Sequence, residues 1–158
     1  MIHIANALQT AVEAALPRLK GLSERQTSRE RGGGKWTAKE ILGHLIDSAD
    51  NNHQRFVRAR STDPLIFPGY DQNAWVLAHA YRARSWHELV DLWAAHNAQV
   101  AQVIASTPDD RRAVQCRIGD NDAVTLLSLM EDYLRHMEHH LGQIFSAESR
   151  RSAGDAAE

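Results

Sequence analysis

The sequence predicts an all-α protein, a four-helix bundle with a long crossover between the second and third helices. Apolar residues recur at intervals of three and four along four segments, as they do on the buried face of a helix. The alternating apolar and polar pattern of a strand is almost absent. The segment 61–84, between the second and third patterns, is too long for a simple turn between neighbouring helices. A crossing connection in a helix bundle accounts for it.

The first two helical patterns lie on either side of a glycine run. The first extends from Ala5 to Leu19 and is followed by the glycines at 32–34. The second begins with Thr37 and Glu40, which form an S/T-x-x-E capping box, and continues to about Arg60.

The third and fourth patterns complete the bundle. Ser85 and Glu88 predict a second capping box, and Pro108 predicts the end of the helix that follows it. For the fourth helix we expect an N-cap at Asn121 or Asp122.

Shorter elements are expected in the connections. Asp71 is placed to cap a short helix that carries Trp75 and Val76, inside the crossover. The stretch Gln115–Gly119 reads as a short extended piece. We expect one domain over residues 1–147 and a flexible polar tail over residues 148–158.

Composition excludes several classes of protein. The chain has 158 residues, of which 43% are hydrophobic and 24% charged, as in globular proteins. A formal net charge of -2 argues against a nucleic-acid surface, and no apolar run is long enough to span a membrane. The start of the chain does not resemble a signal peptide. With Cys116 as its single cysteine, the chain fits a reducing cytoplasm.

Three histidines cluster in the last helical pattern. His136 and His140 are four residues apart, so they lie on the same side of a helix and can reach one metal ion. His139 falls roughly 155° from the centre of the apolar stripe and should face water. A pair is too few for a metal site, and the same spacing also fits surface histidines near the C-terminus of a helix. No zincin, di-iron or phosphate-loop motif is present.

The second helix carries a polar line whose interpretation stays open. The line consists of Glu40, His44, Ser48, Asn51 and Arg55. Periodicity favours an ordinary solvated face, whereas the alternative is a polar pocket covered by the crossover. His53, on the opposite side of this helix from His44, is expected to be a partly buried structural residue.

Two motifs resemble those of the DinB/YfiT-like superfamily. The stretch WTAKEILGHLID at 36–47 resembles its second-helix motif, and HMEHHLGQI at 136–144 resembles its last-helix motif. The segments 54–56 and 67–75 resemble the YfiT-type branch in particular. The resemblance covers about Leu8 to Phe145.

This resemblance implies a four-helix bundle with a crossover and a site for one divalent metal, zinc or nickel. The metal ligands that it implies are His44, His136 and His140, with His139 left out of the set. Three imidazoles leave room for a further ligand, as catalytic sites do.

The resemblance also implies a function, with alternatives. Related proteins include transferases and isomerases that use bacillithiol, mycothiol or glutathione, so a thiol-dependent S-transferase acting on an electrophilic small molecule is expected first. Asn51, Arg55 and Tyr70 are candidates to hold the thiol or the substrate. A metal-dependent hydrolase, in which the metal activates water, is the second possibility, and a metal-binding bundle without catalysis is the third. A homodimer is expected by analogy.

Overall fold

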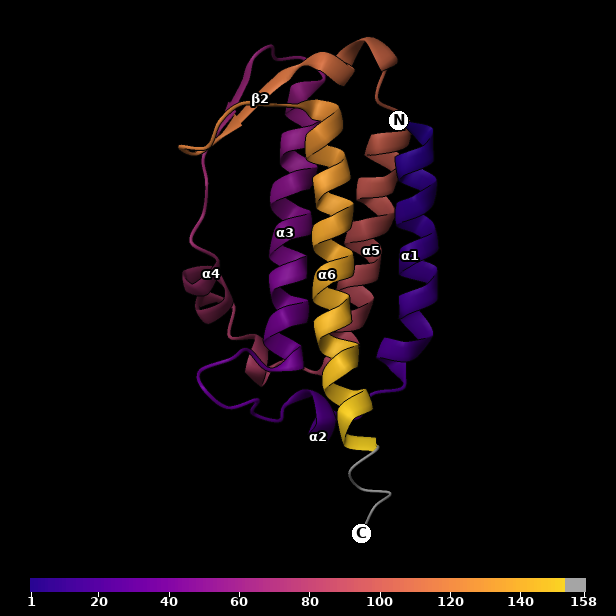
Figure 1. Cartoon of the computed structure of the whole chain (residues 1–158), viewed down its shortest axis with the longest axis vertical. Coiled ribbons are helices and arrows are strands. Elements are labelled where there is room, and N and C mark those ends of the chain that lie inside the picture. Colours follow the sequence, from indigo (N-terminus) through magenta and orange to yellow (C-terminus); the bar gives the residue numbers. More distant parts are fainter. Residues whose placement is uncertain (153–158) are drawn as a thin grey trace.

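The computed structural model describes the backbone of residues 1–152 and the side chains of residues 1–146. Its bundle consists of α1 (Ile2–Lys20), α3 (Ala38–Ala59), α5 (Trp86–Ala105) and α6 (Leu126–Ser152), as Figure 1 shows. The connections contain α2 (Glu24–Thr27), α4 (Gln72–Ala78), the 3₁₀ turns η1 (Tyr81–Ala83) and η2 (Asp109–Ala113), and the strands β1 (Leu65–Phe67), β2 (Gln115–Ile118) and β3 (Val124–Thr125). The predicted all-α four-helix bundle is therefore confirmed.

The order of the helices around the bundle explains the long crossover. Both α1 and α3 pack against α5 and α6, so α1 and α3 occupy opposite corners. In Figure 1, α3 and α5 run in the same direction along the bundle. The chain must therefore return along the outside of the bundle between them, and residues 60–85 make that return through β1, α4 and η1.

The apolar stripes meet in one core. Its largest fully buried side chains include Trp86, Trp93 and Phe56. The indole N–H of Trp86 donates to the carbonyl of Leu19 at 2.7 Å, so α5 is tied to the end of α1 by a satisfied polar contact. Within the described residues, no helix is long and apolar enough to cross a membrane.

Of the two predicted capping boxes, one is present. The Thr37 hydroxyl accepts from the N–H of Glu40, and the Thr37 N–H donates to the Glu40 carboxylate at 2.8 Å. Ser85 occupies the N-cap position of α5, but its side chain makes no capping bond, so the second box was wrong. A carboxylate from another element replaces it, because the N–H of Trp86 donates to Oε1 of Glu24 at 2.6 Å.

The start of the last helix was also predicted wrongly. Residues 124–125 form β3 and pair with β2, so α6 begins at Leu126 instead of after Asn121 or Asp122. The Thr125 hydroxyl accepts the N–H of Ser128 at 3.1 Å and so supplies the cap. At its other end α6 continues to Ser152, into the segment expected as a polar tail; residues 153–158 of that tail lie outside the described residues.

The crossover is anchored at both of its ends. Near α3, β1 pairs in parallel with β2, which lies within the predicted extended piece. The predicted short helix is α4, and the Asp71 carboxylate caps it by accepting from two backbone N–H groups. Near α5, the hydroxyl of Tyr81 donates to Oδ1 of Asp47 at 2.6 Å, and Nδ1 of His79 lies 2.9 Å from the same oxygen.

Gly43 lets the crossover approach α3. A Cβ at Gly43 would overlap the ring of Tyr81, which lies directly on the helix backbone there. We therefore expect Gly43→Ala to destabilise the protein by about 1–3 kcal/mol, because the ring must move away from Asp47. Urea denaturation followed by circular dichroism measures this change.

Gly142 provides the matched control, because it also lies in a helix but a Cβ there would meet no atom within 4 Å. Gly142→Ala should stabilise the protein by up to about 1 kcal/mol. Equal effects of the two substitutions would contradict the proposed close packing at Gly43.

Candidate metal centre

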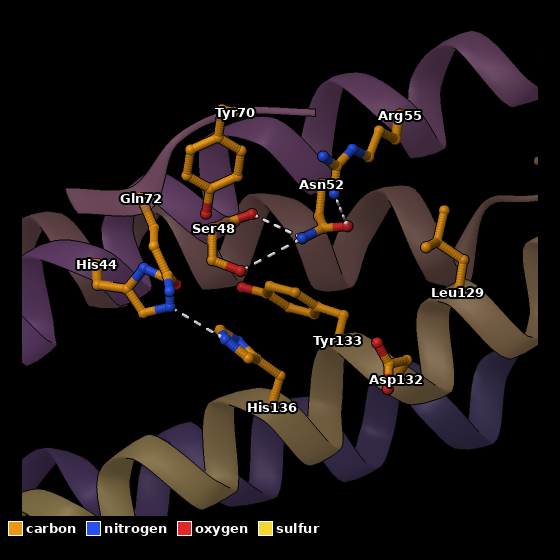
Figure 2. A pocket seen from close by; sticks show the side chains of 10 residues that line it. All are labelled: His44, Ser48, Asn52, Arg55, Tyr70, Gln72, Leu129, Asp132, Tyr133 and His136. Carbon is orange, nitrogen blue, oxygen red and sulfur yellow. Dashed lines mark hydrogen bonds between the residues drawn. The ribbon is translucent and has the colours of Figure 1, made fainter. Parts of the chain in front are cut away.

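The fold brings His44, His136 and His140 together from two helices. One ligand atom from each histidine can be chosen so that all lie within 4.8 Å of one another. Nε2 of His44, on α3, lies 3.1 Å from Nε2 of His136, on α6, and Figure 2 shows the two rings facing each other. The histidine from the second helical pattern and the pair from the last one thus converge on one point.

The chemistry of these donors suits a divalent transition metal. Two nitrogens bound to one tetrahedral zinc ion lie about 3.4 Å apart, close to the separation of His44 and His136. Burial, together with the neighbouring histidines, lowers the pKa of His44 to about 3 and that of His136 to about 4. Burial also lowers the pKa of His140. The imidazoles are therefore neutral near pH 7, which is the form that binds metal.

Gln143 orients the ring of His140. Its Oε1 lies 3.1 Å from Nδ1 of His140, and its Nε2 lies 2.9 Å from Nε2 of His139. An N–H at Nδ1 of His140 that donates to Gln143 leaves Nε2 free to bind a metal. His139 is exposed, as its helical angle predicted, and its ring lies edge-on to that of His140, with 5.2 Å between the ring centroids.

The polar line of α3 is buried, so the solvated interpretation that periodicity favoured was wrong. His44 is only 2% exposed, and its ring centroid lies 5.1 Å from that of Trp36. Ser48 and Arg55 are buried as well. The crossover covers this side of α3, and the helix pattern alone cannot show that a loop replaces solvent there.

The covered space is a pocket of about 210 Å³ that begins at the histidines and extends along α3 (Figure 2). It is lined by His44, Ser48, Asn52, Arg55, Tyr70, Gln72, Leu129, Asp132, Tyr133 and His136. Its volume corresponds to roughly seven water molecules, so it can enclose a small molecule or one part of a larger one.

Two of the three predicted binding residues line this pocket. They are Arg55 and Tyr70. Asn51 does not, and its side-chain amide donates instead to the carbonyl of Asp47 at 2.9 Å. Its neighbour Asn52 faces the pocket and donates to Ser48. Consecutive residues are about 100° apart around a helix, so an error of one residue in the predicted face selects Asn51 in place of Asn52.

Several lining residues were not predicted. Tyr133 comes from α6, and Gln72 comes from the crossover. The Tyr133 hydroxyl donates to Oδ1 of Asn97 at 2.6 Å, so it is held within the core. Tyr133 is three positions before His136, a spacing that is visible in the sequence and places both on one side of α6, but the contribution of the crossover depends on the path of the chain.

The family model of the DinB superfamily matches residues 7–144. The chain belongs to the DinB superfamily. A relative from Geobacillus thermodenitrificans is 23% identical over 92% of this chain and 82% of its own length. YfiT from Bacillus subtilis is 26% identical over 72% of this chain and 64% of its own length. Both relatives carry the provisional name of metal-dependent hydrolase.

Two solved structures share the bundle. The structure of Bacillus subtilis YfiT, described as an unusual four-helix bundle topology, superposes with a TM-score of 0.83 at 19% identity and covers 95% of this chain and 86% of that one. A mycothiol-dependent maleylpyruvate isomerase gives a TM-score of 0.70 at 11% identity, over 88% of this chain and 58% of the isomerase. At these identities the superpositions establish the fold alone.

The geometry predicts about one divalent metal per chain in the purified protein. His44→Ala, His136→Ala and His140→Ala should each reduce the bound metal by more than half, because each removes one of the three ligands that converge there. Elemental analysis after exhaustive dialysis measures the metal content.

His139→Ala is the matched control, since His139 is exposed and next to a ligand. It should keep its metal. Wild-type metal content in His44→Ala would exclude this ligand set.

Proposed function

We propose that the protein is a metal-dependent S-transferase that joins a low-molecular-weight thiol to an electrophilic small molecule. The observation that carries the proposal is the convergence of three neutral imidazoles, two of which, His44 and His136, line one end of a small pocket. Such a set leaves a metal with room for a ligand from the pocket, as catalytic zinc sites do and closed structural sites do not. Zinc or nickel suits imidazole donors.

The chemistry needs an activated sulfur next to space for a second reactant. A divalent metal bound by His44, His136 and His140 would lower the pKa of a thiol or of a water molecule placed beside it. In the transfer, a sulfur–carbon bond forms, the bond from that carbon to its leaving group breaks, and the leaving group takes the electron pair. The proton of the thiol passes to solvent.

The pocket residues can hold the reactants near that sulfur. Burial raises the pKa of Tyr70 to about 12, so its hydroxyl stays protonated and can donate a hydrogen bond. Asn52 and Ser48, on α3, add polar groups to the lining of the same pocket. A polar wall of this kind orients a small ligand. The structural neighbour that uses mycothiol supports a thiol as one reactant.

A second candidate is hydrolysis, which the provisional names of the curated relatives favour. The same three histidines would then serve to activate water, and the pocket would hold the bond to be cleaved. The two activities differ in the nucleophile, and they can be separated by their products.

Incubation with thiols tests the proposal directly. Metal-loaded protein is mixed with bacillithiol, mycothiol, glutathione or cysteine and with monochlorobimane, and the adducts are quantified by mass spectrometry. At least one thiol should give an adduct at about ten times the uncatalysed rate or more. The metal-depleted protein and His136→Ala should fall to the uncatalysed rate.

The proposal that the protein is a transferase is wrong if no thiol reacts faster than in the metal-depleted control. Metal-dependent release of product from ester or amide substrates would then point to the hydrolase, and the absence of both activities would point to a metal-binding protein without catalysis.

A further inference from the structure

Arg55 is a buried cation that faces the pocket without a carboxylate partner. Its side chain is 8% exposed and lines the pocket wall at the end away from His44. Nη1 donates to Oδ1 of Asn52 at 3.3 Å, whereas Nε is buried and has no hydrogen-bond partner. Among the described residues, no carboxylate forms an ion pair with it. A buried guanidinium is costly unless an anion neutralises it.

The acidic residues nearby are engaged elsewhere. Asp132 lines the pocket, but its carboxylate is 66% exposed and lies 2.9 Å from Nη2 of Arg135. Asp47, which does not line the pocket, accepts from Tyr81 and contacts His79. Neither carboxylate pairs with Arg55, whose side chain lines the pocket.

The α3 helix sets the distance between Arg55 and the histidines. His44 and Arg55 are eleven residues apart and lie within about 20° of each other around the helix, with their Cα atoms about 16 Å apart along it. The Arg55 side chain leans back toward His44 in Figure 2, as long side chains on helices do. A ligand that bridges the two ends must therefore be several bonds long.

Tyr70 stands on the crossover side of the same space. Its hydroxyl points into the pocket in Figure 2, and the Arg55 charge acts on it, opposing the rise in the pKa of Tyr70. The protonated hydroxyl of Tyr70 and the guanidinium of Arg55 are both hydrogen-bond donors that line the pocket. The protein offers Arg55 a neutral acceptor, Oδ1 of Asn52, but no carboxylate within the described residues, and donors arranged in this way suit an anionic group.

We propose that Arg55, assisted by Tyr70, binds a carboxylate on the molecule whose reactive end lies at the three histidines. This inference rests on the proposed function, because it assigns an anionic substrate class to the same pocket. The carboxylate belongs either to the thiol or to the electrophile. In both cases the donors and their distance from the histidines are the same.

A pair of synthetic thiols of equal length tests the inference by binding alone. Zinc-loaded protein is titrated calorimetrically with mercaptohexanoate and with neutral mercaptohexanol. The acid should bind roughly ten- to a hundredfold more tightly, as expected for a charge-assisted contact. Mercaptoacetate, which is too short to bridge the pocket, should show no such advantage over mercaptoethanol.

Arg58 provides the matched control variant. Both arginines lie over the ring of Phe67, at 5.5 Å for Arg55 and 5.9 Å for Arg58, but Arg58 is exposed and does not line the pocket. Arg55→Gln should abolish the preference for the acid, and Arg58→Gln should retain it. Arg55→Lys should keep part of the preference, which separates loss of charge from loss of folding.

A second arm identifies the source of the anion. With mercaptoethanol as a neutral thiol, the rates of alkylation by 6-iodohexanoate and by neutral 6-iodohexanamide are compared. An advantage of 6-iodohexanoate that Arg55→Gln removes would place the carboxylate on the electrophile. The inference is overturned if the wild type prefers neither acid in either arm, or if Arg55→Gln keeps the full preference.

The failure of the inference and that of the proposed function are distinguishable. Tight, Arg55-dependent binding of mercaptohexanoate without any transfer would support the anion site and exclude the transferase. Thiol transfer at equal rates for acidic and neutral reactants would support the transferase and exclude the anion site.

Discussion

The contact of Tyr81 with Gly43 determines where the crossover lies, and the pocket depends on that position. The ring lies on the bare backbone of α3, and its hydroxyl donates to Asp47 one turn further along. From this anchor the chain runs along α3 and places Tyr70 and Gln72 over the polar line. Without that cover, His44 and Arg55 would face water, where neither the lowered pKa of the imidazole nor the buried guanidinium would arise.

The buried polar line costs stability that an apolar face would not. Asn52 satisfies its amide by donating to Ser48, but buried nitrogens of His44 and Arg55 have no hydrogen-bond partner in the protein. Buried polar groups without partners, in a fold whose other elements follow the usual preferences, are typical of functional sites. Nε1 of Trp93 and Oδ2 of Asp47 are buried without a partner as well, but of these four residues only His44 and Arg55 line the pocket.

Periodicity was enough to predict the four helices, the capping of α3 by Thr37 and the exposure of His139, because each of these depends on local spacing. It could not show that Asn52 and not Asn51 faces the pocket. The crossover buries a further side of α3, and the helical pattern does not reveal which residues lie under it. Nor could it show that Glu24 caps α5, because that bond joins residues 62 positions apart. The family resemblance, and not the helical periodicity, identified His44 as the third metal ligand. The periodicity alone had favoured a solvated position for His44.

The site has its parts on elements of different rigidity. His44 and Arg55 share α3, so the helical rise fixes the spacing between the metal end and the cationic end of the pocket. His136 and His140 come from α6, and Gln143 on the same helix holds one of these rings. The crossover, in contrast, contributes Tyr70 from a loop between β1 and α4. Metal position and ligand length are therefore set by packed helices, whereas the shape of the ligand also depends on a loop outside the bundle.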